Sequence, residues 1–152
     1  MNDEYFLKLA IKKSKESADK KLFPAGAVVT CDNKLIVQAV SSIWPKANHH
    51  ADSDAVDQAM DKLNRQLSNC TLYLSMEPCL MCINRAYWAG IRRIVFAIKK
   101  QLTKTEYFEG GLKNEDVIKG FTQKLEFIHF LELEQEALEV VRLWEKQGGF
   151  NQ

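Results

Sequence analysis

The stretch that decides the fold is CTLYLSMEPCLMCINRAYWAGIRRIVFAI, residues 70–98. Its first seven residues form a short apolar run that is typical of a buried strand. Glu77-Pro78 breaks the run, and proline at this place suits the first turn of a helix. Gly90 ends that helix, and IRRIVFAI supplies a second strand. The stretch therefore predicts a strand, a helix and a second strand parallel to the first.

The segments on either side complete the predicted order of elements. We expect a helix over 3–21, a hairpin of AGAVVTC and KLIVQAV around Asp32-Asn33, a helix from His50 to Asn64, a loop over 99–112, a strand KLEFIHF and a long C-terminal helix. Because strands alternate with helices through the second half, this order predicts parallel strands with helices on both faces. The expected fold class is a three-layer α/β/α domain with a five-stranded mixed sheet flanked by helices.

Length and composition set the limits on organisation. The 152 residues, 46% of them hydrophobic, fit one domain over 1–152. A net charge of +1 gives no overall field toward nucleic acid or an acidic membrane. The N-terminus has no apolar signal-peptide region and no transmembrane run follows it, so we expect a cytoplasmic protein. In that reducing compartment the four cysteines are expected to be thiols or metal ligands rather than disulfides.

The chemistry of the chain centres on H-A-D at 50–52 and P-C-L-M-C at 78–82. Cys79 and Cys82 are three residues apart, so one helical turn places both sulfurs on the same side. A helix N-terminus also favours the thiolate that binds a metal. His50 starts a separate helix and can complete the set. Two thiolates and one imidazole favour zinc, and three protein ligands leave a fourth position for water, as in a catalytic site.

Two other interpretations of the cysteines stay open at this point. A single C-x-x-C in a cytosolic protein can be a redox pair, although His50 is then unexplained. A closed structural zinc site needs a fourth ligand, for which His49, Cys31 and Cys70 are the candidates. Neighbouring side chains usually point apart, which disfavours His49 beside His50. Cys31 and Cys70 lie in apolar strand patterns, so we interpret both as small buried core residues.

The two motifs resemble the signature of the cytidine deaminase superfamily, H-x-E followed by P-C-x-x-C. The stretch LSMEPCLMCINRAYWAGIRRIVFA, at 74–97, and PAGAVV, from Pro24, are similar to the branch of guanine deaminases and tRNA adenosine deaminases. The resemblance covers residues 5–98 well and the last 50 residues less closely. It implies a cytidine deaminase-like fold, a Zn²⁺ cofactor and a homodimer.

The resemblance also implies a role for each motif residue. The zinc ligands become His50, Cys79 and Cys82, and a zinc-bound water attacks the ring carbon of a base while ammonia leaves. Asp52 takes the place of the glutamate that carries protons in the family. Its side chain is one methylene shorter, and a misplacement of about 1 Å can cost about 100-fold in rate. Glu77 and Asp54 are near in sequence and are interpreted as structural.

The substrate side of the site departs further from the family. Related enzymes commonly read N-D-P-T-A-H, with an asparagine upstream that holds the substrate, where this chain reads SSIWPKANHH at 41–50. Ser41 or Ser42 falls near the place of that asparagine, and Asn48 does not. The expected substrate contacts are Ser42, Trp44, His49, Ala51, Tyr107 and Phe108. Trp88 is expected in the core, and Phe150 is only weakly similar to a C-terminal aromatic residue of guanine deaminases.

The predicted function is zinc-dependent hydrolytic deamination of a small nucleobase or nucleoside, in the cytoplasm. We place guanine-type chemistry ahead of adenosine in tRNA, because the C-terminal helix, at 132–146, carries more acid than base. Lysines at 99, 100 and 104 keep the tRNA hypothesis open. A third hypothesis is a catalytically impaired scaffold or ligand-binding protein, in which Asp52 marks lost catalysis.

Overall fold

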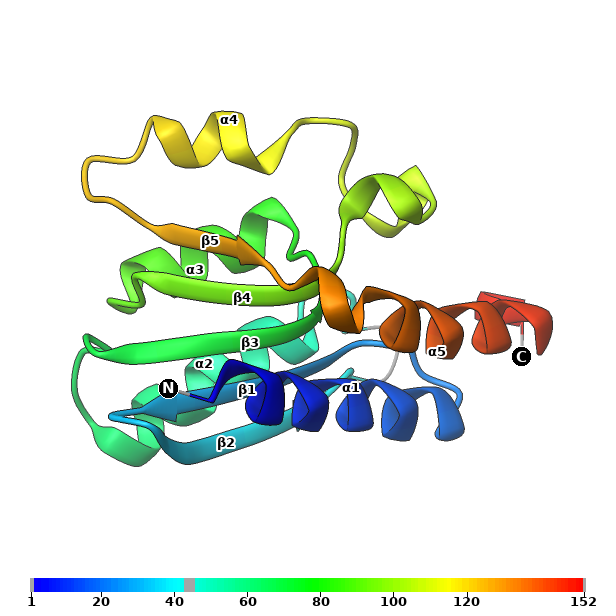
Figure 1. Cartoon of the computed structure of the whole chain (residues 1–152), viewed down its shortest axis with the longest axis horizontal. Coiled ribbons are helices and arrows are strands. Elements are labelled where there is room, and N and C mark those ends of the chain that lie inside the picture. The colour runs from blue at the N-terminus through cyan, green and yellow to red at the C-terminus, as the bar shows by residue number, and fades with distance from the viewer. Residues whose placement is uncertain (1, 43–45, 152) are drawn as a thin grey trace.

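The computed structural model describes residues 2–42 and 46–151 (Figure 1). Its helices and strands are α1 (Asp3–Asp19), β1 (Gly26–Cys31), β2 (Lys34–Val40), α2 (Ala51–Leu63), β3 (Cys70–Met76), α3 (Leu80–Trp88), β4 (Arg93–Ile98), α4 (Asn114–Lys119), β5 (Glu126–His129) and α5 (Glu134–Lys146). Four short 3-10 turns lie after β4, before α5 and at the C-terminal end. The order of helices and strands predicted from the sequence is confirmed except for α4, which was not predicted.

The five strands form one mixed sheet in the order β2-β1-β3-β4-β5. β1 runs antiparallel to β2 and to β3, whereas β3, β4 and β5 are parallel. β1 and β3 are buried along their whole lengths, as expected of strands covered on both faces. The predicted five-stranded mixed sheet, with one antiparallel hairpin ahead of parallel strands, is confirmed.

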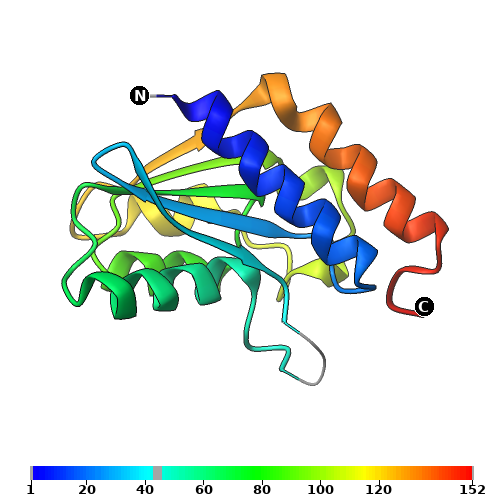
Figure 2. The same cartoon turned by 90° about the horizontal axis from the view of Figure 1, so that it is seen from below.

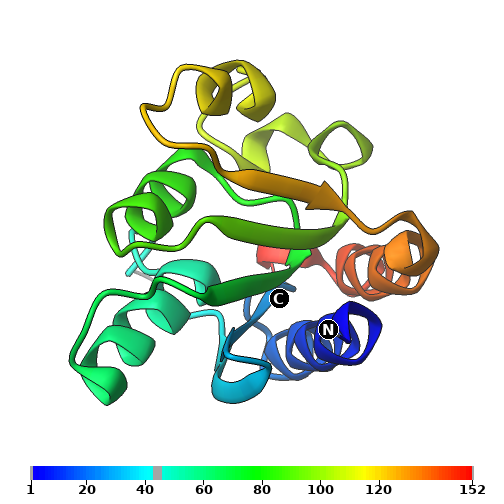
Figure 3. The same ribbon diagram turned by 60° about the vertical axis from the view of Figure 1, so that its left-hand side comes forward.

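Helices cover both faces of this sheet. Figures 2 and 3 show α1 and α5 side by side on one face and α2 and α3 together on the other. Each face has its own apolar core: Phe6, Leu7 and Val141 belong to the one under α1 and α5, and Val56 and Ile83 to the one under α2 and α3. The three-layer α/β/α prediction therefore holds.

The N-terminal helix is fixed to the sheet by an ionic contact and by a close backbone approach. The Arg93 guanidinium donates to both oxygens of Asp3, at 2.8 and 2.6 Å, and the Tyr73 hydroxyl donates to the same carboxylate at 2.7 Å. In the middle of the helix, a Cβ on Gly26 would lie 2.1 Å from the Ala10 carbonyl oxygen. Glycine at this position lets α1 lie directly against β1.

The hairpin between β1 and β2 turns without glycine. Asp32 and Asn33 have φ values of 52° and 62°, the left-handed pair that a type I′ turn needs. Asp and Asn are the non-glycine residues that tolerate this region best. A two-residue turn at this place was predicted, and its type follows from the backbone angles.

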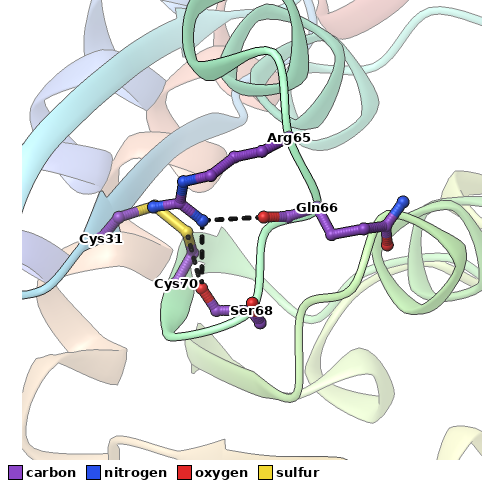
Figure 4. Close-up of a disulfide and its surroundings, with 5 residues drawn as sticks. All are labelled: Cys31, Arg65, Gln66, Ser68 and Cys70. Carbon is purple, nitrogen blue, oxygen red and sulfur yellow. Dashed lines mark hydrogen bonds between the residues drawn. A yellow bond between two sulfur atoms is a disulfide. The ribbon is translucent and has the colours of Figure 1, made fainter.

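The expectation that all four cysteines are thiols or metal ligands is wrong for one pair. Cys31 and Cys70 are buried, as predicted, but they form a disulfide (Figure 4). They are register partners at the ends of β1 and β3, so the sheet itself brings them face to face. The Arg65 side chain lies beside the bond and donates to the Gln66 carbonyl oxygen at 2.8 Å.

Two further details differ from the sequence prediction. Trp88, expected in the core, is 79% exposed at the end of α3, because Ile83 and Ala86 occupy the buried side of that helix. The segment after the predicted 99–112 loop forms a short helix, α4, that was not predicted. Within residues 2–42 and 46–151, no helix is both long and apolar enough to cross a membrane.

Candidate metal centre and its cavity

Two helix N-termini bring His50, Cys79 and Cys82 together. His50 is the N-cap residue of α2, Cys79 is the N-cap residue of α3, and Cys82 lies one turn into α3. The Nδ1 atom of His50 is 3.5 Å from the Cys79 sulfur and 3.4 Å from the Cys82 sulfur, and the two sulfurs are 3.5 Å apart. Both thiols are buried. The three side chains therefore form one compact group that could hold a metal ion.

The size of this triangle fits zinc. With Zn–S bonds of about 2.3 Å and a Zn–N bond of about 2.0–2.1 Å, tetrahedral angles set S···S near 3.8 Å and S···N near 3.5 Å. The observed separations of 3.4–3.5 Å match these values within a few tenths of an ångström. Zinc thus needs little rearrangement of the three ligands, and a set of two thiolates and one imidazole suits it chemically.

The backbone around His50 fixes the ring in the orientation a metal needs. Its Nε2 lies 2.9 Å from the Ala47 carbonyl oxygen, which can only accept, so Nε2 carries the proton. In the neutral form that binds a metal, the lone pair of the ring is then on Nδ1, which faces both sulfurs. The backbone N–H of His50 donates to the Ser53 hydroxyl at 2.9 Å and holds the N-terminus of α2. Such outer contacts are typical of metal-binding histidines.

Contacts within this group shift the pKa values of all three side chains. The hydrogen bond with Cys82, helped by the one with His50, lowers the pKa of Cys79 to about 5. The hydrogen bond with Cys79 raises the pKa of His50 to about 9, against the effect of burial. The same contact with Cys79, together with burial, raises the pKa of Cys82. A thiolate is therefore present at Cys79 near neutral pH, as a metal ligand requires.

Asp52 lies in the same cavity as His50 and Cys79 and is 8% exposed. Burial and the nearby Cys79 raise its pKa to about 7, while His50 acts in the opposite direction. The carboxyl group occupies the H-x-D position in the first turn of α2, and its pKa responds to both Cys79 and His50, so it lies beside the metal-binding group. A carboxyl group in such a place can exchange protons with a bound ligand.

A cavity of about 700 Å³ opens over the metal-binding group. Its polar lining includes His50, Asp52, Glu77 and Cys79. Its aromatic lining, which we call the aromatic wall, is Phe23, Tyr107, Phe108, Trp144 and Phe150. Four of these rings contact one another, with Phe23 stacked on Phe150 at 5.9 Å between ring centres. Polar, metal-binding side chains together with an aromatic wall suit a flat heterocyclic ligand.

Some of the predicted substrate contacts line the cavity and one does not. Ser42, His49, Tyr107 and Phe108 line the cavity, as do two residues, Trp144 and Phe23, that were not expected there. Ala51 is fully buried in the apolar core and is not among the lining residues. Trp44 lies outside the described residues.

A buried polar network ties the loop after β4 to the metal-binding turn. Glu77 accepts from the Lys100 backbone N–H at 2.9 Å and from the Asn114 amide at 2.7 Å, and the same amide donates to the Pro78 carbonyl oxygen. Glu77 and Asn114 are both buried. The structural role predicted for Glu77 fits these contacts, but Asn114 and α4 gave no signal in the sequence.

Glu109 makes a second link between this loop and the metal-binding helix. Its carboxylate accepts from the Leu80 backbone N–H, the first of α3, at 3.0 Å. Tyr107 and Phe108, the adjacent residues, form part of the aromatic wall. This contact could not be predicted from a single glutamate in a loop, because the two segments come together only in the folded chain.

Comparison with known families decides what this arrangement belongs to. Residues 1–98 match the cytidine and deoxycytidylate deaminase zinc-binding region, which spans both motifs and the first four strands. The chain belongs to the cytidine deaminase superfamily. The resemblance seen in the two motifs is thereby confirmed, and the superfamily match supports a zinc-binding role for the site.

Within the superfamily, relatives with different named activities are about equally similar to this chain. It is 35% identical to a probable cytosine deaminase of Schizosaccharomyces pombe over 80% of this chain and 67% of that protein. It is 32% identical to the tRNA-specific adenosine deaminase of Aquifex aeolicus, over 64% and 66%. It is 30% identical to the guanine deaminase of Bacillus subtilis, over 83% and 81%. These proteins are all deaminases, but they do not share one substrate.

Solved structures of the superfamily share the fold. Guanine deaminase from Nitrosomonas europaea superposes with a TM-score of 0.79 at 21% identity, over 93% of this chain and 83% of that one. Guanine deaminase from Bacillus subtilis superposes with a TM-score of 0.65 at 26% identity, over 94% and 95%. The three-layer architecture is therefore that of the superfamily.

Proposed function

We propose that this protein is a zinc-dependent hydrolytic deaminase of a free nucleobase or nucleoside, with guanine-type purines favoured. The observation that carries the proposal is the cavity, whose lining combines His50, Cys79 and Asp52 with the aromatic wall. A flat base would lie against the aromatic wall with its amino-bearing carbon toward His50, Cys79 and Cys82.

The chemistry divides between the metal and the chain. His50, Cys79 and Cys82 would hold the zinc ion, which when bound would make a water molecule acidic enough to lose a proton near neutral pH. Overall, water adds its oxygen to the ring carbon, the C–N bond to the amino group breaks, and ammonia leaves. Asp52 accepts a proton from the water and passes it to the ring nitrogen and the leaving amine. The aromatic wall holds the ring and excludes bulk water from the reacting carbon.

The aspartate at this position sets a geometric demand on the substrate. Its side chain is shorter than glutamate, so the base must approach the first turn of α2 more closely, or one water must connect the two. Asp52 is buried and lines the cavity, so its carboxyl group has little freedom to move away from this place. We therefore propose that Asp52 acts in proton transfer with a geometry of its own.

The tRNA hypothesis has weaker support in the structure. Two of the three lysines that favoured it have partners within the protein. The Lys100 ammonium donates to the Leu112 carbonyl oxygen at 2.8 Å and lies 4.8 Å from the centre of the Phe108 ring. The Lys104 ammonium lies 3.9 Å from a Glu145 carboxylate oxygen. Lysines held in this way offer less to phosphates than a solvated basic surface does.

Ammonia release tests the proposal. Zinc-loaded protein is incubated with guanine, adenine, cytosine, their nucleosides and unmodified tRNA, and ammonia is measured for each. We expect release from a purine base or nucleoside and none from tRNA. Asp52→Ala should abolish this release while zinc stays bound, and Asp61→Asn, on the exposed side of the same helix, should not change it. If no compound in the panel releases ammonia, the result would favour the scaffold hypothesis instead.

A further inference from the structure

Asp54 holds two side chains of the cavity wall at once. Its Oδ2 accepts from the Ser42 hydroxyl at 2.6 Å, and its Oδ1 lies 3.0 Å from Nδ1 of His49. Ser42 and His49 both line the cavity, and Asp54 itself does not. Asp54 lies two residues after Asp52 in the first turn of α2, so the same turn supplies one carboxylate to the cavity and one to its wall.

These contacts fix the hydrogen-bonding polarity of the wall. A carboxylate can only accept, so both partners donate to Asp54. The single hydroxyl proton of Ser42 is used in this way, which leaves its lone pairs for a ligand. The Nδ1–H of His49 is likewise used on this carboxylate. Ser42 therefore presents an acceptor and no donor to the cavity.

We propose that Asp54 makes this wall selective for a substrate edge that donates hydrogen bonds. The ligand class is a heterocycle that turns an amino group or a ring N–H toward the Ser42 oxygen, and a carbonyl oxygen at that place is disfavoured. An oxo edge would meet this acceptor and leave both oxygens unpaired. Asp54 acts here as a positioning residue, because it reaches the ligand only through Ser42.

The inference rests on the proposed deaminase cavity, but its test reads binding rather than turnover. Four purines combine an amino or an oxo group at C2 with an amino or an oxo group at C6: guanine, xanthine, 2,6-diaminopurine and isoguanine. Whichever of the two positions faces the wall, one comparison within this set isolates its effect. Dissociation constants are measured by calorimetry with zinc-loaded protein in an Asp52→Asn background, in which the ligand is not consumed.

We expect the amino compound to bind at least about tenfold more tightly than its oxo partner at one of the two positions, the size of one hydrogen bond exchanged for an unpaired acceptor. Asp54→Asn should reduce this ratio to below about threefold, because an amide that donates to the Ser42 oxygen frees the Ser42 hydroxyl proton to donate to the ligand. Zinc content should stay unchanged. Asp61→Asn in the same background is the matched control and should keep the full ratio.

Two results would overturn the inference: no preference for an amino group at either position, or a preference that Asp54→Asn leaves intact. If Asp54→Asn does not fold, Ser42→Ala replaces it, since that variant removes one acceptor and should also reduce the ratio. A protein that shows the Asp54-dependent preference but releases no ammonia would refute the proposed function alone. A working deaminase without this preference would refute the inference alone.

Discussion

Removing the Glu77 carboxylate should loosen the loop after β4, which carries Tyr107 and Phe108 of the aromatic wall. Glu77 accepts two hydrogen bonds, from the Lys100 backbone N–H and from the Asn114 amide, and both join the loop after β4 to the metal-binding turn. Hydrogen bonds to a charged group contribute about 1.5–3 kcal/mol each, so their gross value is about 3–6 kcal/mol. Part of this is offset, because burial raises the pKa of Glu77 and a buried charge is itself costly. We expect Glu77→Ala to lower the free energy of unfolding by about 2–4 kcal/mol.

Glu77→Gln should be milder and should change with pH. Glutamine keeps an acceptor for the Lys100 N–H but places an amide donor against the Asn114 amide, for an expected loss of about 1–2 kcal/mol. Because folding raises the pKa of Glu77 above its ordinary value of 4.5, the wild-type side chain stabilises most below that value. This stabilisation is lost as the pH rises through the folded pKa. The deficit of Glu77→Gln should therefore be largest at low pH and shrink toward neutral pH.

Urea unfolding of the zinc-loaded proteins between pH 4 and pH 8, followed by circular dichroism, measures both effects. Glu115→Gln is the matched control, because Glu115 is exposed and affects Glu77 only through its charge. That change should be neutral or slightly stabilising. A Glu77→Ala variant that unfolds within about 0.5 kcal/mol of wild type would refute the reasoning, since surface substitutions without partners fall in that range.

Two further predictions concern parts of the fold away from the cavity. Asp3→Asn should cost about 1–3 kcal/mol at neutral pH, since it removes the charge from a carboxylate bound by Arg93 and Tyr73. The Arg93 hydrogen bond lowers the pKa of Asp3 below 3.8. The greater stability of wild type over Asp3→Asn should therefore be lost as the pH falls through the pKa of Asp3 in the folded protein. An unfolding free energy that depends on acid pH in the same way for both proteins would contradict this prediction. Reduction of the Cys31–Cys70 disulfide, which closes a sequence separation of 39 residues, should lower the free energy of unfolding by about 3–4 kcal/mol. Unfolding with and without reductant, with zinc kept saturated, checks this, and Cys31→Ser should then be insensitive to reductant.

Much of the fold follows from local patterns in the chain. The alternation of apolar runs and helical patterns predicted each strand, most clearly β1 and β3, which are buried along their whole lengths because both faces of the sheet are covered. Gly90, with a φ of 103°, ends α3 as its position suggested. α4 has only six residues and no side-chain cap at its start, so it offers too little periodicity to be predicted.

Part of the site could likewise be predicted from local sequence, and part depends on tertiary packing. His50, Cys79 and Cys82 could be predicted because each lies at a strand-to-helix junction, and helical spacing brings the two sulfurs together. The Cys31–Cys70 disulfide depends on the register of β1 against β3, which a separation of 39 residues does not reveal. The hydrogen bonds of Asp54 with Ser42 and of Glu109 with Leu80 likewise depend on where the loops pack, and no local sequence pattern predicts that.

The central claim, that these three side chains hold one zinc ion, is tested most directly by the metal content of the purified protein. Inductively coupled plasma mass spectrometry should find about one zinc per chain after gentle purification in wild type and in Asp61→Asn. Cys82→Ala should contain almost none, because it removes one of the two thiolates. Wild type with much less than one zinc, or Cys82→Ala with as much zinc as wild type, would contradict the assignment of His50, Cys79 and Cys82 as the metal site.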